Sequence, residues 1–182
     1  MKKLDREFIL RALTRLGELA EEQGLKLELC IYGGAAMMLA YDSRTITKDV
    51  DAVVRPSREG MRLAHIVAQE LELPDGWIND QVKMFAAPTE GMRPLPLDIR
   101  GLALTIPTAS YLLAMKAMAC RKPLPGYDGD VEDIRFLVRK MKIKSVSAVQ
   151  QHIDQYYPDD VIPPADAALI ETIIQEVRDE QA

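Results

Sequence analysis

The stretch that most constrains this chain is residues 31–54, IYGGAAMMLAYDSRTITKDVDAVV, where an apolar segment runs into two adjacent glycines. Residues 25–32 alternate apolar and polar side chains, which predicts a strand, and residues 35–41 are apolar and helix-forming. Gly33 and Gly34 stand between them. A strand that enters a glycine turn and then a helix leaves backbone N–H groups at the helix start, where phosphate can bind. Glycines are common in tight strand–helix turns, so the pair by itself predicts only such a turn. Together with the acids that follow it, the pair predicts a phosphate site.

A pair of acids follows the glycines. Asp49 and Asp51 flank Val50 at the start of the valine-rich run over residues 49–54. Alternate residues of a strand project from the same face, so both carboxylates lie opposite the core if Val50 faces it. Neighbouring carboxylates repel each other unless a cation neutralises them. We therefore predict that the pair binds a divalent metal ion, in preference to its being the solvent side of an edge strand.

A third acid, Asp98, lies between Leu97 and Ile99 in residues 97–106, which the apolar pattern predicts to be a strand. By itself Asp98 is equally compatible with a strand end or with an ion pair to Arg100. A site for two metal ions needs several hard oxygen ligands. We therefore expect Asp98 to supply the third carboxylate.

The parts together resemble the nucleotidyltransferase fold of the DNA polymerase beta superfamily. That pattern combines an apolar residue and Gly-Gly, an Asp-x-Asp strand and a later acidic strand, here Tyr32-Gly33-Gly34, Asp49-Val50-Asp51 and Leu97-Asp98-Ile99. Further matching positions are Arg44, Thr47, Lys116, Arg121 and Asp130-x-x-Asp133. With them the chain looks like the AbiEii-type nucleotidyltransferases, known as toxins of bacterial toxin–antitoxin systems, and their uncharacterised relatives. The likeness covers roughly residues 25–138 at the level of predicted elements.

The resemblance implies an enzyme that moves a nucleoside monophosphate from a nucleoside triphosphate such as ATP or GTP to an acceptor. The acceptor would be an RNA such as tRNA or a protein side chain, in a toxin–antitoxin setting with an antitoxin partner. It implies Mg²⁺ or Mn²⁺ at Asp49, Asp51 and Asp98, with these acids and Lys116 catalytic. The implied nucleotide-binding residues are Gly33, Gly34, Arg44, Thr47, Lys116 and Asp130. The alternative class is a nucleotide-binding or partner-docking protein with the same fold and no turnover.

Several of these residues have a second interpretation. Lys116 lies in an apolar helix predicted to end at Cys120, where a lysine ordinarily extends its ammonium to solvent; under the resemblance it contacts triphosphate. Asp130, with Asp133 three positions on, has the spacing of an ordinary helix cap; under the resemblance it lies near the site. Arg44 either binds phosphate or pairs with an acid of the site.

Periodicity predicts an α+β fold with a core and a helical part. The nucleotidyltransferase core, residues 1–106, has a small mixed sheet flanked by helices over residues 4–23, 35–41 and 57–71, the last capped by Ser57. The C-terminal region, residues 107–182, is helical, with helices ending near residues 120, 142, 156 and 180. Residues 77–87 are ambiguous: a helical turn over 77–80 and an edge strand over 82–86 fit them.

Composition limits the function classes. A chain of 182 residues, 48% hydrophobic, should fold, and its net charge of -5 argues against a simple nucleic-acid binder. Its two histidines have no ligand pattern around them, so we expect no zinc site. Cys30 and Cys120 are expected to be free thiols, as in a reducing cytoplasm. No segment resembles a signal peptide or a membrane span, so we expect a soluble cytoplasmic protein.

Overall fold

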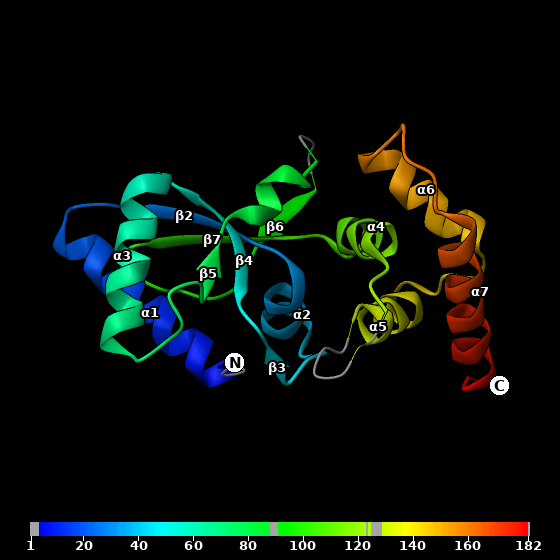
Figure 1. The fold of residues 1–182 in the computed structure, drawn as a ribbon, viewed down its shortest axis with the longest axis horizontal. Helices are drawn as coiled ribbons and strands as arrows, with labels where there is room; N and C mark the ends of the chain where they lie inside the picture. The colour runs from blue at the N-terminus through cyan, green and yellow to red at the C-terminus, as the bar shows by residue number, and fades with distance from the viewer. Residues whose placement is uncertain (1–3, 88–90, 123, 125–128, 182) are drawn as a thin grey trace. The chain divides into compact units, whose positions relative to one another are not determined.

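The structure, a computed structural model, describes residues 4–87, 91–122, 124 and 129–181 (Figure 1). Its first compact unit contains β1 (Leu4–Asp5), α1 (Arg6–Glu22), β2 (Leu27–Ile31), α2 (Gly33–Tyr41), β3 (Ile46–Thr47), β4 (Val50–Arg55), α3 (Ser57–Glu70), β5 (Ile78–Asn79), the 3-10 helix η1 (Gln81–Met84), β6 (Met92–Pro94) and β7 (Leu102–Pro107). The second contains α4 (Ala109–Ala119), α5 (Val131–Met141), α6 (Val146–Tyr156) and α7 (Pro164–Asp179). The predicted α+β class is confirmed. The first unit ends at Pro107, one residue beyond the predicted core, and Ala87 and Gly91 belong to the second.

The first unit is built on a five-stranded mixed sheet in the order β5-β4-β2-β7-β6. The pairs β2/β4 and β6/β7 are antiparallel, whereas β4/β5 and β2/β7 are parallel. Along β4, Val50, Ala52 and Val54 are buried, and Asp51 and Val53 are only half-buried. Val50 therefore faces the core, as the sequence pattern requires, and Asp51 projects from the opposite face.

Helices α1 and α3 lie side by side over one face of this sheet (Figure 1). Each approaches the sheet through a glycine. A side chain at Gly60 in α3 would collide with Val54, and one at Gly17 in α1 would collide with the backbone carbonyl of Arg100. The apolar faces of both helices bury their leucines, alanines and valines against the strands, which is the main driving force for this arrangement.

The structure differs from the predicted elements at several places in the first unit. Leu4–Asp5 does not begin α1 but forms β1, which pairs with β3 in a separate two-stranded sheet. Residues 77–87 reverse the expected order, because the strand β5 comes first and the helical turn η1 second. Pro56 occupies the cap position of α3 that was predicted for Ser57.

In the second unit α4 packs against α5 and α6, and α7 packs against α5 and α6. Helix α4 is apolar over most of its circumference, as expected of a helix surrounded by others, and Lys116 is buried among its apolar residues. Both cysteines are free: Cys120, at the end of α4, is buried, and Cys30, in β2, is half-buried. Burial and the nearby acids Asp166 and Asp130 raise the pKa of the Cys120 thiol to about 11. In the part of the chain that the structure describes, none of the helices is both long and apolar enough to cross a membrane.

At Gly17, packing and helix propensity predict opposite changes in the free energy of unfolding when glycine is replaced by alanine. Alanine is a better helix former than glycine by about 1 kcal/mol, so propensity alone predicts that Gly17→Ala stabilises the protein. We expect the opposite, a loss of about 1–3 kcal/mol in the free energy of unfolding, because the new methyl group meets a backbone carbonyl that cannot rotate away. Urea denaturation measures the difference. Gly76→Ala is the control, since nothing lies within 4 Å of its Cβ position, and a stabilised Gly17→Ala would contradict the packing described.

Candidate functional site

The sequence-predicted glycine turn lies where β2 passes into α2. Gly33 has φ +59°, a left-handed conformation that favours glycine. The first intrahelical bond of α2 runs from Ala36 N to Tyr32 O at 3.1 Å. The N–H groups before Ala36 have no partner within the helix, as at any helix start. The turn therefore presents backbone donors and the positive end of the helix dipole at this edge of the sheet.

Asp51 lies directly against this turn. A Cβ atom on Gly33 would come within 2.6 Å of Asp51 Oδ2. The backbone holds the two segments together, because Tyr32 N donates to Asp51 O at 2.8 Å. The structure thus brings the glycine turn and one of the predicted metal ligands into contact. The lack of a side chain at Gly33 makes that contact feasible.

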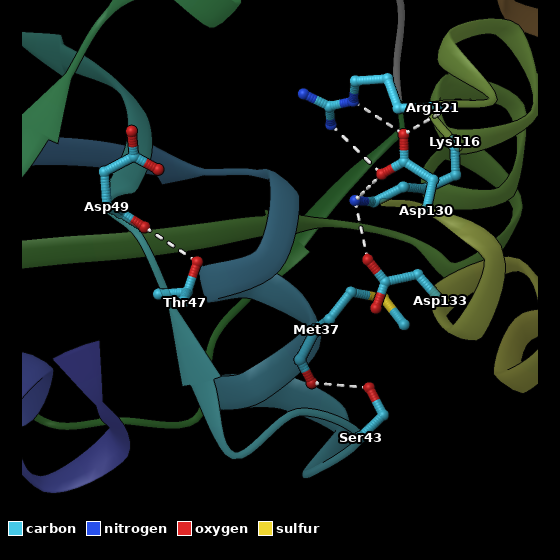
Figure 2. Close-up of polar contacts among 8 residues, drawn as sticks. All are labelled: Met37, Ser43, Thr47, Asp49, Lys116, Arg121, Asp130 and Asp133. Carbon is cyan, nitrogen blue, oxygen red and sulfur yellow. Dashed lines mark hydrogen bonds and ion pairs between the residues drawn. The ribbon is translucent and has the colours of Figure 1, made fainter. Parts of the chain in front are cut away.

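Arg44 and Thr47 meet the second glycine. A Cβ atom on Gly34 would lie 2.7 Å from Thr47 Oγ1 and 3.0 Å from Arg44 Nη1. Thr47 is buried in β3, and its hydroxyl donates to the Asp49 carbonyl at 3.2 Å, as Figure 2 shows. The loop that carries Arg44 is also fixed at its start, where Ser43 Oγ donates to Met37 O at 3.2 Å (Figure 2). A guanidinium group therefore stands beside the start of α2.

Asp49 is the residue immediately before β4, and Asn79 of β5 holds its side chain. Asn79 Nδ2 donates to Asp49 Oδ2 at 3.2 Å, and Asn79 Oδ1 accepts from Gln81 N at 3.2 Å. In the parallel β4/β5 pair Asn79 stands opposite Asp51. Paired residues of neighbouring strands project from the same face, so the Asn79 side chain lies on the face of Asp51. Sequence reasoning missed Asn79, although the apolar Trp77-Ile78 before it was a strand signal.

Asp98 is not part of this group. The prediction that it lies on a strand is wrong, because it precedes β7 and is exposed. The first residue of β7, Leu102, pairs with Leu27 at the amino end of β2, whereas Gly33 follows the carboxyl end of β2. Asp98 is therefore at the opposite end of the sheet from Asp51. Within residues 4–87, 91–122, 124 and 129–181, no group of three or more His, Cys, Asp and Glu side chains is arranged to hold a metal ion.

Lys116, Arg121, Asp130 and Asp133 form a charged cluster inside the second unit (Figure 2). Lys116 Nζ lies 2.6 Å from Asp130 Oδ1 and 2.8 Å from Asp133 Oδ2, and the Lys116 side chain is only 5% exposed. Arg121 adds bonds to Asp130 from both its backbone N–H and its guanidinium. Lys116 thus neither extends to solvent nor presents a bare ammonium to a ligand, and the geometry gives it a structural role.

Asp130 also departs from the capping interpretation. It occupies the cap position of α5, but its carboxylate makes no capping bond to the helix. Burial by itself would raise the pKa of Asp130, but the hydrogen bonds from Arg121 and the positive charge of Lys116 outweigh it and hold the pKa below its usual range. Two carboxylates and two cations balance within the cluster, which ties α4 to α5.

Comparison of the chain with protein-family models, with curated proteins and with solved structures gives no match.

The buried cluster predicts an acid-sensitive stability. Because the folded-state pKa of Asp130 is depressed, its contribution is complete above the unfolded value of about 3.9 and is lost as the pH falls below that value. Asp130→Asn should lower the free energy of unfolding by about 3–5 kcal/mol at pH 7, because it leaves buried positive charge uncompensated. It should also flatten the pH dependence of stability in that window.

Urea denaturation between pH 7 and pH 3 measures both effects. Asp159→Asn is the matched control, because Asp159 is exposed. Equal stability of Asp130→Asn and the unmodified protein at pH 7 would show that the cluster does not tie the helices.

Proposed function

We propose that the first unit is a metal-dependent nucleotidyltransferase, which transfers a nucleoside monophosphate from a nucleoside triphosphate to an acceptor hydroxyl. The observation that carries the proposal is the meeting of three features at one end of the sheet: the glycine turn, the Arg44 guanidinium and the acids that begin β4. Such a set suits a triphosphate, which needs backbone N–H donors, positive charge and a cation. The nucleotidyltransferase fold is part of the same proposal.

The residues at the start of β4 fit a magnesium ion. Proteins ordinarily hold Mg²⁺ through one or two carboxylates together with substrate phosphates. Asp49 and Asp51 supply two carboxylates, and Asn79 fixes the orientation of the first. When bound, the ion would neutralise phosphate charge and polarise the α-phosphate. The three-carboxylate arrangement expected from the sequence is not proposed, since Asp98 lies at the other end of the sheet.

The chain's own residues have separate tasks in this scheme. The N–H groups at Gly33 and Gly34 bind the outer phosphates, and Arg44 offsets the charge that grows on the departing pyrophosphate. The acceptor oxygen forms a bond to the α-phosphorus as the bond to the β-phosphate breaks, and the hydroxyl proton passes to a carboxylate of the pair. Lys116 was expected to serve the pyrophosphate, but its ammonium is engaged by Asp130 and Asp133. We assign that task to Arg44 because its guanidinium stands beside Gly34 at the start of α2.

The acceptor classes in the proposal are those that the resemblance implies, an RNA such as tRNA or a protein side chain, in a toxin–antitoxin setting. The net charge of -5 gives no general attraction for RNA. An RNA acceptor would therefore have to be bound by local contacts.

One observation favours a second function, nucleotide binding or partner docking without turnover. The predicted third carboxylate, Asp98, lies at the other end of the sheet from Asp51. A binding protein needs no third acid, whereas a reaction assisted by two metal ions uses several oxygen ligands. The assay below separates the two functions, because it measures binding and transfer independently.

Asp51→Asn should reduce nucleotidyl transfer by at least about 100-fold, because it removes a charge from the reacting centre. It should not lower stability in metal-free buffer, since it relieves repulsion between neighbouring carboxylates. The measurement uses α-³²P-labelled nucleoside triphosphates with Mg²⁺ and offers total cellular RNA and the protein itself as acceptors. Full transfer by Asp51→Asn would refute the scheme. Mg²⁺-dependent binding without transfer by the unmodified protein would establish the second function.

A pair of glycine variants tests the phosphate role of the turn. Gly33 and Gly24 both have positive φ, +59° and +65°, so alanine at either position costs about 1–2 kcal/mol of backbone strain. Nothing lies within 4 Å of the Gly24 Cβ position, whereas the Gly33 position is crowded by Asp51. Gly33→Ala should therefore weaken ATP binding by about tenfold or more, and Gly24→Ala should leave it unchanged. Equilibrium dialysis with labelled ATP measures this, and equal affinities for the two variants would exclude the turn as the phosphate site.

A further inference from the structure

An aromatic side chain is exposed on the turn that follows β5. Met84 ends η1 and Phe85 follows it, and the two are 72% and 66% exposed. The two side chains place apolar and aromatic surface on the turn that follows β5. The other large hydrophobic residues that are exposed in the described part of the chain, Leu124 and Val161, are aliphatic and belong to the second unit.

The turn that carries Phe85 is fixed to the acids of the site. Asn79 links the two, because its amide nitrogen donates to Asp49 while its oxygen accepts from Gln81 N, the first residue of η1. Val82 is buried, and its carbonyl accepts from Phe85 N at 2.9 Å. The phenyl ring is thus presented from an anchored turn that packs against β4.

The order of the strands gives the direction in which a nucleotide would lie. Gly33 follows β2, Asp51 is on β4 and Asn79 ends β5, and these three strands are consecutive neighbours in the sheet. Strands are spaced about 4.8 Å apart, so β2 and β5 are roughly 10 Å apart. In the proposed function the outer phosphates bind at the start of α2 and the α-phosphate at the acids, so the nucleoside would extend past β5 toward η1.

We propose that Phe85 is the stacking platform for the base of the nucleoside triphosphate; this inference rests on the proposed nucleotide site. Stacking on an aromatic face tolerates every base, because each base has a π-face. A platform of this kind contributes affinity without reading base edges. The four ribonucleoside triphosphates should therefore bind within a few-fold of one another.

The test compares two probes, ATP and inorganic triphosphate, each with Mg²⁺, on the full chain. The unmodified protein should bind ATP about tenfold more tightly than inorganic triphosphate, which has no base to stack. Phe85→Ala should lose about that factor for ATP and keep its affinity for inorganic triphosphate, which also shows that the phosphate site is intact. Phe85→Trp should retain ATP affinity. Val161→Ala, which truncates an exposed side chain of the second unit, is the control.

Different outcomes contradict the two proposals. Equal affinity of the unmodified protein for ATP and inorganic triphosphate would overturn the platform while leaving the phosphate site, and this comparison needs no variant. Undiminished ATP binding by Phe85→Ala would also overturn the platform and leave the phosphate site in place. Failure of the unmodified protein to bind either probe would overturn the proposed function, and the platform with it.

Discussion

The candidate site depends on one close approach between backbone and side chain, that of Gly33 to Asp51. The β2/β4 pairing places the turn and the carboxylate at the same level of the sheet, and the hydrogen bond from Tyr32 N to Asp51 O keeps them there. Any side chain at Gly33 would occupy the position of the carboxylate. Gly33 also has φ +59°, a conformation that favours glycine. The arrangement therefore requires glycine at this position.

The two units differ in the exposure and pairing of their aspartates. In the first, Asp49 and Asp51 remain partly exposed. In the second, Asp130 and Asp133 are buried and are neutralised by Lys116 and Arg121. A buried ionic group gains little net stability over an apolar one, but losing a single member is costly. The cluster therefore fixes the packing of α4 against α5. Its charged groups bind one another and are not available to a ligand such as triphosphate.

Local patterns predicted the parts of the structure that local interactions decide. The alternation before Gly33 and the valine-rich run after Asp49 were sufficient to place β2, α2 and β4, and the same reasoning gave the correct face to Val50. The prediction for Asp98 failed because the position of this residue depends on where β7 begins and on which end of β2 the start of β7 pairs with. Both are non-local properties that a run of apolar residues does not specify.

The charged cluster and Asn79 were missed for related reasons. Lys116 and Asp130 are fourteen positions apart on different helices, so no helical spacing connects them. The sequence alone predicted that Lys116 extends its ammonium to solvent, and the resemblance predicted that it contacts phosphate. Asn79 belongs to a two-residue strand that exists only because β4 is beside it. A segment that short has too few residues to show an alternating pattern.

The small β1/β3 sheet has a consequence for how the site is completed during folding. Leu4 pairs with Thr47, the residue whose hydroxyl supports Asp49 and packs against Gly34. This pairing closes a loop of some forty residues that contains all of α1, β2 and α2, and only two residue pairs offset the entropic cost of that closure. We therefore expect the support beneath the acids to be less stable than the five-stranded sheet and to open before it. Amide hydrogens of β3 would exchange with solvent ahead of those of β2 and β4.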